Sequence, residues 1–193
     1  MSEEALVLAS RSPRRRRLLE MLGISHTVYP VEVDEQVRAG ENPEDYASRL
    51  AGEKARAGSQ QHPGRWVLGA DTVVVLGSDM LGKPRSPVEA ESMLTRLAGN
   101  RHRVITAVSL VRGDQSHEAR DVTAVWFRPM TREMVREYVR TGEAMDKAGS
   151  YAIQGRGAVL VERIEGDYFG VMGLPVRLVV DLMKAAGVPY SFT

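Results

Sequence analysis

One run of ten residues, Val67–Leu76, constrains the fold of this chain more than any other. Two apolar, β-branched stretches in this run flank a single carboxylate, Asp71, and Gly77-Ser78-Asp79 follows at once. The pattern predicts a buried strand that returns through a tight hairpin turn. Because water does not solvate an ion in a central strand, Asp71 needs a cation, a metal ion or hydrogen-bond donors beside it.

Lys83 lies at the far end of the same expected hairpin, in a Gly-Lys-Pro turn that presents an ammonium group. A buried carboxylate and a cation brought to one place by a hairpin would form a reaction centre. In the structural alternative, Asp71 only caps a bend in the sheet and Lys83 is a solvated turn residue. These two residues alone do not separate the two interpretations.

The first helix is expected to begin at Pro13, with Ser12 as its N-cap. Four consecutive arginines follow, and helical geometry treats them differently. Stepping back four residues from the apolar leucine stripe leads to Arg14 and Arg15, so these two continue the core-facing side. The run is therefore not a uniform basic surface.

An anion site is expected where the short strand before this helix turns at Ser10. The helix N-terminus supplies backbone N–H groups suited to a phosphate, and Arg14 and Arg15 add positive charge. Arg16 instead pairs outward with Glu20 at i,i+4. The alternative is a solvated run of arginines, and the geometry favours the anion site over it.

Two more charged residues lie on mainly apolar surfaces. Alternation would place Glu35 on the same side as Val33, which makes Glu35 a weak metal-ligand candidate against the more common solvated acidic loop. Asn42 and Pro43 open a second helix, and Lys54 lies on its small, apolar stripe. A lysine there can also extend its ammonium group to water, so a functional role is only one of two interpretations.

The rest of the chain alternates helices with strands, and hairpins are frequent. This order predicts an α/β protein with a mixed sheet. The expected elements are an edge strand at Thr27–Val31, a helix capped by Ser86, a hairpin over residues 103–127, a helix capped by Thr131, a glycine-rich loop at 142–157, a strand at Ala158–Ile164 and a last helix from Pro175.

Composition excludes several classes of protein. The chain has 193 residues, and its 26 basic and 25 acidic side chains give a net charge of +1, so no global field attracts nucleic acid. It has no cysteine, which excludes disulfides and thiolate chemistry. The acidic start is unlike a secretory signal, and no apolar run approaches the roughly 20 residues of a membrane span. We therefore expect a cytoplasmic protein that binds neither nucleic acid nor membranes.

Three separated segments resemble the signatures of the Maf family of nucleoside triphosphate pyrophosphatases. They are Leu8-Ala9-Ser10-x-Ser12-Pro13-Arg14-Arg15; Gly69-Ala70-Asp71-Thr72-Val73-Val74 with Gly82-Lys83-Pro84; and Asp146-Lys147-Ala148-Gly149-x-Tyr151-x-Ile153-Gln154-Gly155 with Gly173-Leu174-Pro175. The segments follow one another in the family's order and spacing. The resemblance extends from Leu6 to the last helix, and we treat residues 1–193 as a single Maf-like domain.

The resemblance implies a fold, an activity and a cofactor. The fold is a long twisted mixed β-sheet flanked by helices, with two lobes around a central cleft, as in the inosine triphosphate pyrophosphatases. The activity is hydrolysis of a nucleoside triphosphate between the α and β phosphates, which releases the monophosphate and pyrophosphate. A divalent metal ion, Mg2+ with Mn2+ or Co2+ as substitutes, is required, and a homodimer is expected.

The family pattern also assigns roles to residues. A triphosphate carries about four negative charges, and attack at phosphorus requires them to be neutralised and the water to be aligned. The resemblance implies three catalytic residues, Asp71 as the base with Lys83 and Lys54, and it implies that Glu35 and Asp71 hold the metal ion. The residues expected to bind substrate are Ser10, Arg14, Arg15, Thr72 and Gln154.

Base choice depends on Gln154, because one carboxamide matches both the N3–H donor and the O4 acceptor of thymine or uracil. The related branch that acts on 7-methylguanosine triphosphate has a tryptophan where Arg14 stands, a glutamine where Thr72 stands and a glutamate near Gln154. These three residues therefore indicate the dTTP/UTP branch, with modified pyrimidine triphosphates as further substrates in a housecleaning role.

Two alternatives stay open at this point. Within the same class, the chain could be a 7-methyl-GTP pyrophosphatase. In another class, it could be a nucleotide-responsive regulator of cell division and septum formation with weak catalysis. A nucleic-acid-binding role would rest on the arginine run alone, and the balanced net charge disfavours it.

Overall fold

Seven strands form one mixed β-sheet in this computed structural model, which describes residues 6–192. β1 is parallel to β2 and β3, whereas β3 and β4, and β6 and β7, pair antiparallel. The predicted α/β fold with a mixed sheet is confirmed. The order is β2 (His26–Val28), β1 (Leu6–Leu8), β3 (Val67–Leu76), β5 (Arg101–Arg112), β6 (Gln115–Phe127) and β7 (Val161–Glu165), and β4 (Asp79–Leu81) also pairs with β3.

The helices begin where the capping residues predict. Ser12, Asn42, Ser86 and Thr131 each accept a hydrogen bond from the backbone N–H three residues later. The helices are α1 (Pro13–Met21), α2 (Pro43–Gln61), α3 (Pro87–Leu97), α4 (Arg132–Arg140), α5 (Tyr168–Met172) and α6 (Val176–Ala185), with short 3₁₀ turns η1 (Ala148–Ser150) and η2 (Gly155–Leu160).

The chain divides into two compact units. The first contains the residues up to Asp71, Thr106–Asp121 and the residues from Gly173 on. The second contains Thr72–Ile105 and Val122–Met172. β3, β5 and β6 each contain a boundary, so all three strands contribute residues to both units.

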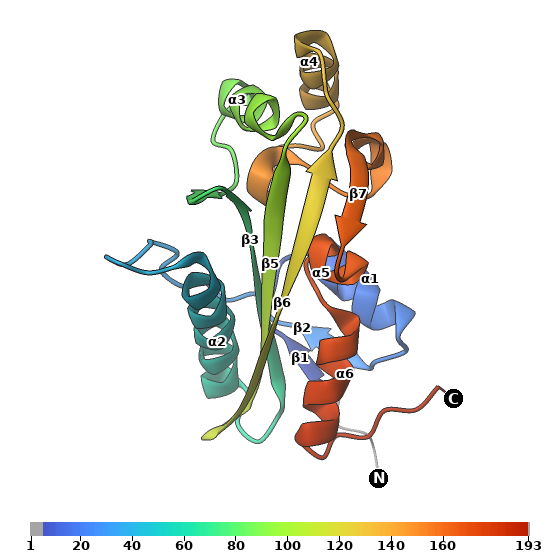
Figure 1. Ribbon diagram of the computed structural model, residues 1–193. Helices are drawn as coiled ribbons and strands as arrows, with labels where there is room; N and C mark the ends of the chain where they lie inside the picture. The colour runs from blue at the N-terminus through green and yellow to red at the C-terminus, as the bar shows by residue number, and fades with distance from the viewer. Residues whose placement is uncertain (1–5, 193) are drawn as a thin grey trace. The chain divides into compact units, whose positions relative to one another are not determined.

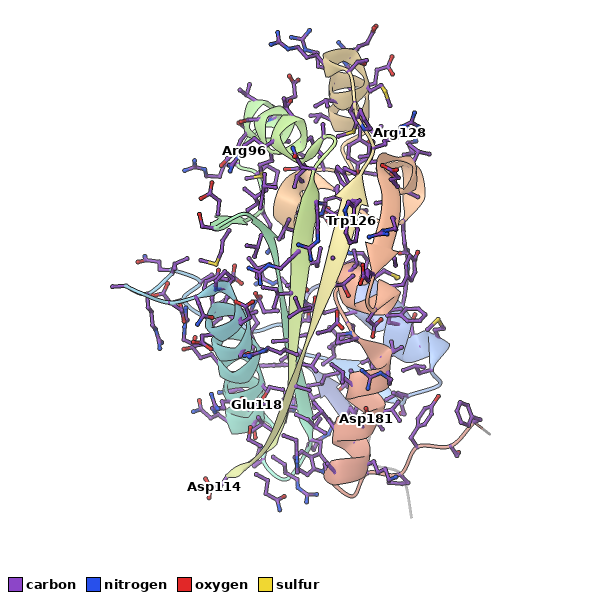
Figure 2. The ribbon with its side chains drawn as sticks, viewed as in Figure 1. Arg96, Asp114, Glu118, Trp126, Arg128 and Asp181 are labelled. Atoms are coloured by element: carbon purple, nitrogen blue, oxygen red, sulfur yellow. The ribbon has the colours of Figure 1, made fainter. Side chains whose placement is uncertain are left out.

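In the first unit, α2 lies on one side of the strands and α6 on the other (Figure 1). α2 approaches β3 closely at Gly69, where a Cβ atom would lie only 2.3 Å from the carbonyl oxygen of Ala51. Arg56 of α2 also donates to Glu118 of β6 (3.2 Å), which is labelled in Figure 2. The close approach at Gly69 places the helix that carries Lys54 directly against the strand that carries Asp71.

In the second unit, a buried aromatic cluster supports the glycine-rich segment. The rings of Phe127 and Tyr151 lie with centroids 4.6 Å apart, and His102 packs against both of them. Gly149 lies so close to β3 that a Cβ atom on it would be 2.9 Å from the side chain of Val74. The segment therefore rests on the core although it has little regular structure.

Two predictions about local structure are wrong, and one helix was missed. Residues 29–38 have no regular structure, so the alternation used to place Glu35 beside Val33 does not apply. The strand expected at Ala158–Ile164 begins only at Val161, because Gly155–Leu160 form the 3₁₀ turn η2. The helix α5 was not predicted at all.

Other predictions hold with small changes. β2 is an edge strand as expected, but it ends at Val28, before Pro30. The sequence Ala5–Ala9 predicts a short buried first strand; Ala5 lies outside the described residues, and β1 covers Leu6–Leu8. Within the part of the chain that the structure describes, no helix is long and apolar enough to cross a membrane.

Candidate active site

Lys54 joins two carboxylates in the first unit. Its Nζ donates to Asp71 Oδ1 at 2.6 Å and to Glu35 Oε1 at 2.8 Å. Asp71 and Lys54 are largely buried, with 12% of each side chain exposed. Of the partners expected for the buried Asp71, the structure shows a cation from α2, and two acidic side chains from distant parts of the chain meet at its ammonium group.

The packing of α2 explains how Lys54 reaches this position. Ala51, Ala55 and Gly58 are buried around it, and small residues there let the helix lie close to β3. The stem of Lys54 crosses this apolar stripe, and its ammonium ends at the carboxylates of Glu35 and Asp71 rather than in water. The alternative of a lysine that only extends to solvent is thus wrong.

Ser10 and Arg15 form a second contact in the same unit. Arg15 Nη1 donates to the hydroxyl of the buried Ser10 (3.2 Å), and its Nε donates to the carbonyl of Gly173 (2.8 Å). Ser10 Oγ also accepts the backbone N–H of Ser12 (3.2 Å). Burial lowers the pKa of Arg15, and the nearby negative charge of Asp71 opposes this shift. Arginine stays protonated in proteins, so a fixed positive charge lies at the start of α1.

The first turn of α1 has the predicted two-sided character. Arg14 and Arg15 are half-buried, whereas Arg16 and Arg17 are exposed. Arg16 pairs with Glu20 at 3.1 Å, as expected from the i,i+4 spacing. The geometry therefore directs two of the four arginines toward the molecule and leaves the other pair at the surface.

The donor set at Lys54 fits a magnesium ion that also uses substrate oxygens. Mg2+ in proteins is commonly bound through one or two carboxylates, with water and phosphate oxygens completing its octahedron. Glu35 and Asp71 offer two such carboxylates close to one cation. Among the described residues there is no group of three or more His, Cys, Asp or Glu side chains that could enclose a metal on its own.

The remaining predicted residues belong to the second unit. Thr72 is half-buried in β3, while Lys83 and Gln154 are exposed, the latter as the residue before η2. A backbone hydrogen bond from Gly149 to the carbonyl of Gly82 (3.1 Å) joins the Gly-Lys-Pro turn to the glycine-rich segment. Two of the three motif segments thus meet here. That Lys83 and Gln154 act together with Arg14 and Asp71 stays a prediction.

Two residues of α2 that contact the segment around Glu35 were not predicted. Tyr46 donates its hydroxyl to the backbone carbonyl of Glu35 (3.0 Å), and Arg49 donates to the carbonyls on either side. The spacing of Arg49 and Glu53 is typical of a solvated i,i+4 pair. Only 12% of the Arg49 side chain is exposed, and no pattern in the sequence signals this burial.

Comparisons with known proteins agree on one family. The family model described as Maf-like protein matches residues 5–186. The chain is 50% identical over 186 residues to the dTTP/UTP pyrophosphatase of Symbiobacterium thermophilum, covering 96% of both chains. It is 49% identical to the dTTP/UTP pyrophosphatase of Myxococcus xanthus, covering 95% of this chain and 93% of that protein.

Among solved structures, the Ham1 protein of Staphylococcus aureus aligns with 81% of this chain and 79% of its own, at 14% identity and a TM-score of 0.48.

Proposed function

Because the chain belongs to the Maf-like protein family, we propose that it hydrolyses dTTP and UTP to the nucleoside monophosphate and pyrophosphate. Two relatives at about half identity over nearly the whole chain carry the name dTTP/UTP pyrophosphatase. Modified pyrimidine triphosphates are further proposed substrates. The proposal includes a homodimer in the cytoplasm.

The observation that carries the proposal is the contact of Lys54 with Asp71 and Glu35. A carboxylate that is hydrogen-bonded at one oxygen and largely shielded from water is suited to take a proton from a nucleophile. The adjacent half-buried Arg15 adds positive charge, which a triphosphate needs and a neutral substrate does not.

In the proposed reaction, water attacks the α phosphorus while the bond to the β-phosphate oxygen breaks and pyrophosphate leaves. Asp71 Oδ1 is held by Lys54, and we assign Oδ2 to accept the proton of the attacking water. Lys54, Lys83, Arg14 and Arg15 stabilise the negative charge that moves onto the phosphate oxygens. Mg2+, held by Glu35 and Asp71, would neutralise phosphate charge and align the phosphate oxygens.

Base selection is assigned to Gln154. Gln154 is exposed at the start of η2, where its carboxamide is available to pair with the N3–H and O4 groups of uracil or thymine. Thr72 and Arg14 complete the residue set that favours pyrimidines over 7-methylguanine. Ser10, whose hydroxyl is held by Arg15, would contact an end phosphate.

A nucleotide panel tests the proposed function. dTTP, UTP, CTP, GTP and 7-methyl-GTP are incubated with the protein and Mg2+, and pyrophosphate and orthophosphate are measured separately. We expect pyrophosphate as the first product and the highest kcat/KM for dTTP and UTP. Orthophosphate as the first product would refute the bond assignment, and a preference for 7-methyl-GTP would refute the roles of Gln154 and Thr72.

Replacement of the proposed base separates the enzyme from a regulator of cell division. Asp71→Asn should lower kcat about 10³-fold, because an amide cannot take the proton of the water. Asp114→Asn, in the exposed turn between β5 and β6, is the matched control and should leave kcat unchanged. If an effect on cell division persists in Asp71→Asn cells, that effect does not depend on hydrolysis.

A further inference from the structure

The segment that carries Glu35 is exposed and irregular, yet side chains of α2 hold its backbone at three successive residues. Arg49 Nη1 donates to the carbonyl of Asp34 (3.5 Å), the Tyr46 hydroxyl to that of Glu35 (3.0 Å), and Arg49 Nη2 to that of Gln36 (3.0 Å). Neither a strand nor a helix fixes these residues. Their position is therefore set by α2.

Arg49 uses all five of its N–H donors in this arrangement. Besides the two carbonyls, Nε and Nη2 form a fork with the Glu41 carboxylate (2.5 and 2.8 Å), and Nη1 donates to Glu53 (3.3 Å). Only 12% of the Arg49 side chain and 8% of the Glu41 side chain are exposed. The fork lowers the pKa of Glu41 to about 2, so this carboxylate is ionised at neutral pH.

The C-terminal end of the segment is also held by hydrogen bonds. Glu41 Oε2 accepts the backbone N–H of Arg38 (3.0 Å), and Arg38 itself donates to Glu53 of α2 (2.8 Å). Residues 34–41 are thus tied to α2 at both ends, with Arg49 at the centre. The same helix carries Lys54, which contacts the Glu35 side chain.

These contacts bear on how Glu35 could serve a metal ion. An exposed, irregular segment loses conformational entropy when its side chain is recruited as a ligand, which weakens binding. A segment already held in place avoids this loss, and groups that orient a metal ligand typically change metal affinity 10- to 100-fold when they are removed. Arg49 and Tyr46 hold this segment through the backbone carbonyls of residues 34–36.

We infer that Arg49, assisted by Tyr46, is a positioning residue that holds the Glu35 carboxylate ready for the divalent metal ion of the reaction. The inference rests on the proposed function, since it deepens the role assigned to Glu35. Arg49 touches neither the nucleotide nor the metal in this assignment. It acts through the backbone of residues 34–36.

Arg49→Lys tests the inference, because lysine keeps the charge but lacks the planar fork and two of the five donors. Mn2+ alone serves as the probe, and electron paramagnetic resonance measures the free ion in the absence of nucleotide. We expect the Mn2+ dissociation constant to rise about tenfold, with a similar rise in the Mg2+ concentration for half-maximal dTTP hydrolysis. At saturating Mg2+, the KM for dTTP should be close to the wild-type value.

Arg56→Lys is the matched control on the same helix. The Arg56 side chain is more than half exposed and forms an ion pair with Glu118 at 3.2 Å. Arg49, in contrast, is largely buried and uses all five of its donors. This variant should bind Mn2+ as the wild type does. Glu35→Gln should raise the Mn2+ dissociation constant at least as much as Arg49→Lys, and an unchanged constant in Glu35→Gln would overturn the inference.

Thermal unfolding separates positioning from a merely structural role. If Arg49→Lys is folded at the assay temperature and binds Mn2+ with wild-type affinity, the inference is wrong. If Arg49→Lys does not fold, Tyr46→Phe tests the inference instead, since this variant loses only one hydroxyl. Its Mn2+ dissociation constant should rise about two- to threefold, and no rise would refute the inference. A wild type that binds Mn2+ through Glu35 but releases no pyrophosphate from dTTP would refute the proposed function alone.

Discussion

Burial controls the ionisation of His102 in the aromatic cluster of the second unit. Its side chain is 2% exposed, and Nε2 lies 2.8 Å from the hydroxyl of Tyr151. Burial lowers the pKa of His102 from 6.5 to about 4. The imidazole is therefore neutral at pH 7, and it is a structural partner of Tyr151 and not a charge available for phosphate binding.

This shift predicts a loss of stability in mild acid. Between pH 6.5 and pH 4 the unfolded chain binds a proton at His102 that the folded chain does not, so stability falls as the pH falls through this range. From pH 7.5 to pH 5 the free energy of unfolding should drop by about 2 kcal/mol through this residue. Urea unfolding at the two pH values measures the change.

His102→Gln is the control for this pH dependence. Glutamine keeps a hydrogen-bonding group near Tyr151 but does not titrate, so the variant should lose about 2 kcal/mol less than the wild type over the same pH interval. Equal losses in both proteins would show that His102 is already protonated in the folded state or is not the group responsible.

At the scale of elements, the contact between α2 and β3 depends on the absence of a side chain at Gly69. A Cβ atom there would lie 2.3 Å from the carbonyl oxygen of Ala51 and 2.6 Å from the backbone nitrogen of Ala55. Both of these atoms belong to the helix backbone and cannot move alone. The spacing of helix and strand, and with it the Lys54–Asp71 contact, therefore requires glycine.

Gly69→Ala should lower the free energy of unfolding by about 3 kcal/mol, at the upper end of what overpacking costs, because the whole helix has to shift. Gly82→Ala is the control, since a Cβ atom there meets nothing within 4 Å and its backbone is not in the left-handed region. Urea unfolding compares the two variants. Similar small losses in both would contradict the close approach of α2.

The carboxylate of Glu143 holds the glycine-rich segment through two backbone hydrogen bonds. Glu143 accepts the backbone N–H groups of Arg156 (3.1 Å) and Gly157 (3.2 Å) at the start of η2. Gly155 lies between Gln154 and the two residues that donate to Glu143. Its φ is +66°, and a Cβ atom on it would be 2.8 Å from Glu143 Oε1. Glu143 thus fixes the turn that carries the proposed base-selecting residue.

Gly155→Ala should raise the KM for dTTP about tenfold, because displacement of Glu143 moves the segment that carries Gln154. Gly142→Ala is the matched control for Gly155→Ala. Because φ is +78° at Gly142, the left-handed strain of roughly 1 kcal/mol is similar in both variants. At Gly142, however, nothing lies within 4 Å of the added Cβ atom. Steady-state kinetics with dTTP compares them. The expectation fails if both variants change the KM equally.

At the scale of the whole molecule, the two compact units share three strands. β3, β5 and β6 pass from one unit to the other without a break in the chain or in the strand. A strand loses much of its stability when part of its pairing is lost, so disruption of one unit should propagate to the other. We expect a single cooperative unfolding transition.

The two tryptophans make this expectation measurable. Trp66 belongs to the first unit and stacks on Arg112, whereas Trp126, labelled in Figure 2, belongs to the second unit and stacks on Arg163. Trp126→Phe leaves a reporter of the first unit, and Trp66→Phe leaves one of the second. Fluorescence and circular dichroism should give the same urea midpoint within each variant, and a fluorescence transition separate from the circular dichroism transition would contradict the expectation.

The amino-acid sequence by itself determined the features that arise from contacts over a few residues. The N-caps Ser12, Asn42, Ser86 and Thr131, the hairpin after Leu76 and the Arg16–Glu20 pair were all predictable. Each depends on hydrogen bonds or side-chain contacts at spacings of two to four residues, which the order of residues alone specifies. The need of Asp71 for a cation, a metal ion or hydrogen-bond donors also followed from its apolar neighbours.

Only the tertiary structure decided which groups meet across long sequence distances. The expected hairpin made Lys83 the candidate cation for Asp71. In the structure Lys54 donates to this carboxylate, because α2 packs against β3 at Gly69. In the same way, the i,i+4 spacing of Arg49 and Glu53 is typical of a surface pair, whereas the fold leaves only 12% of the Arg49 side chain exposed and bonds it to the segment that carries Glu35. Helical periodicity shows which face of a helix is buried, but the strand and the loop that this face meets depend on how the whole chain packs.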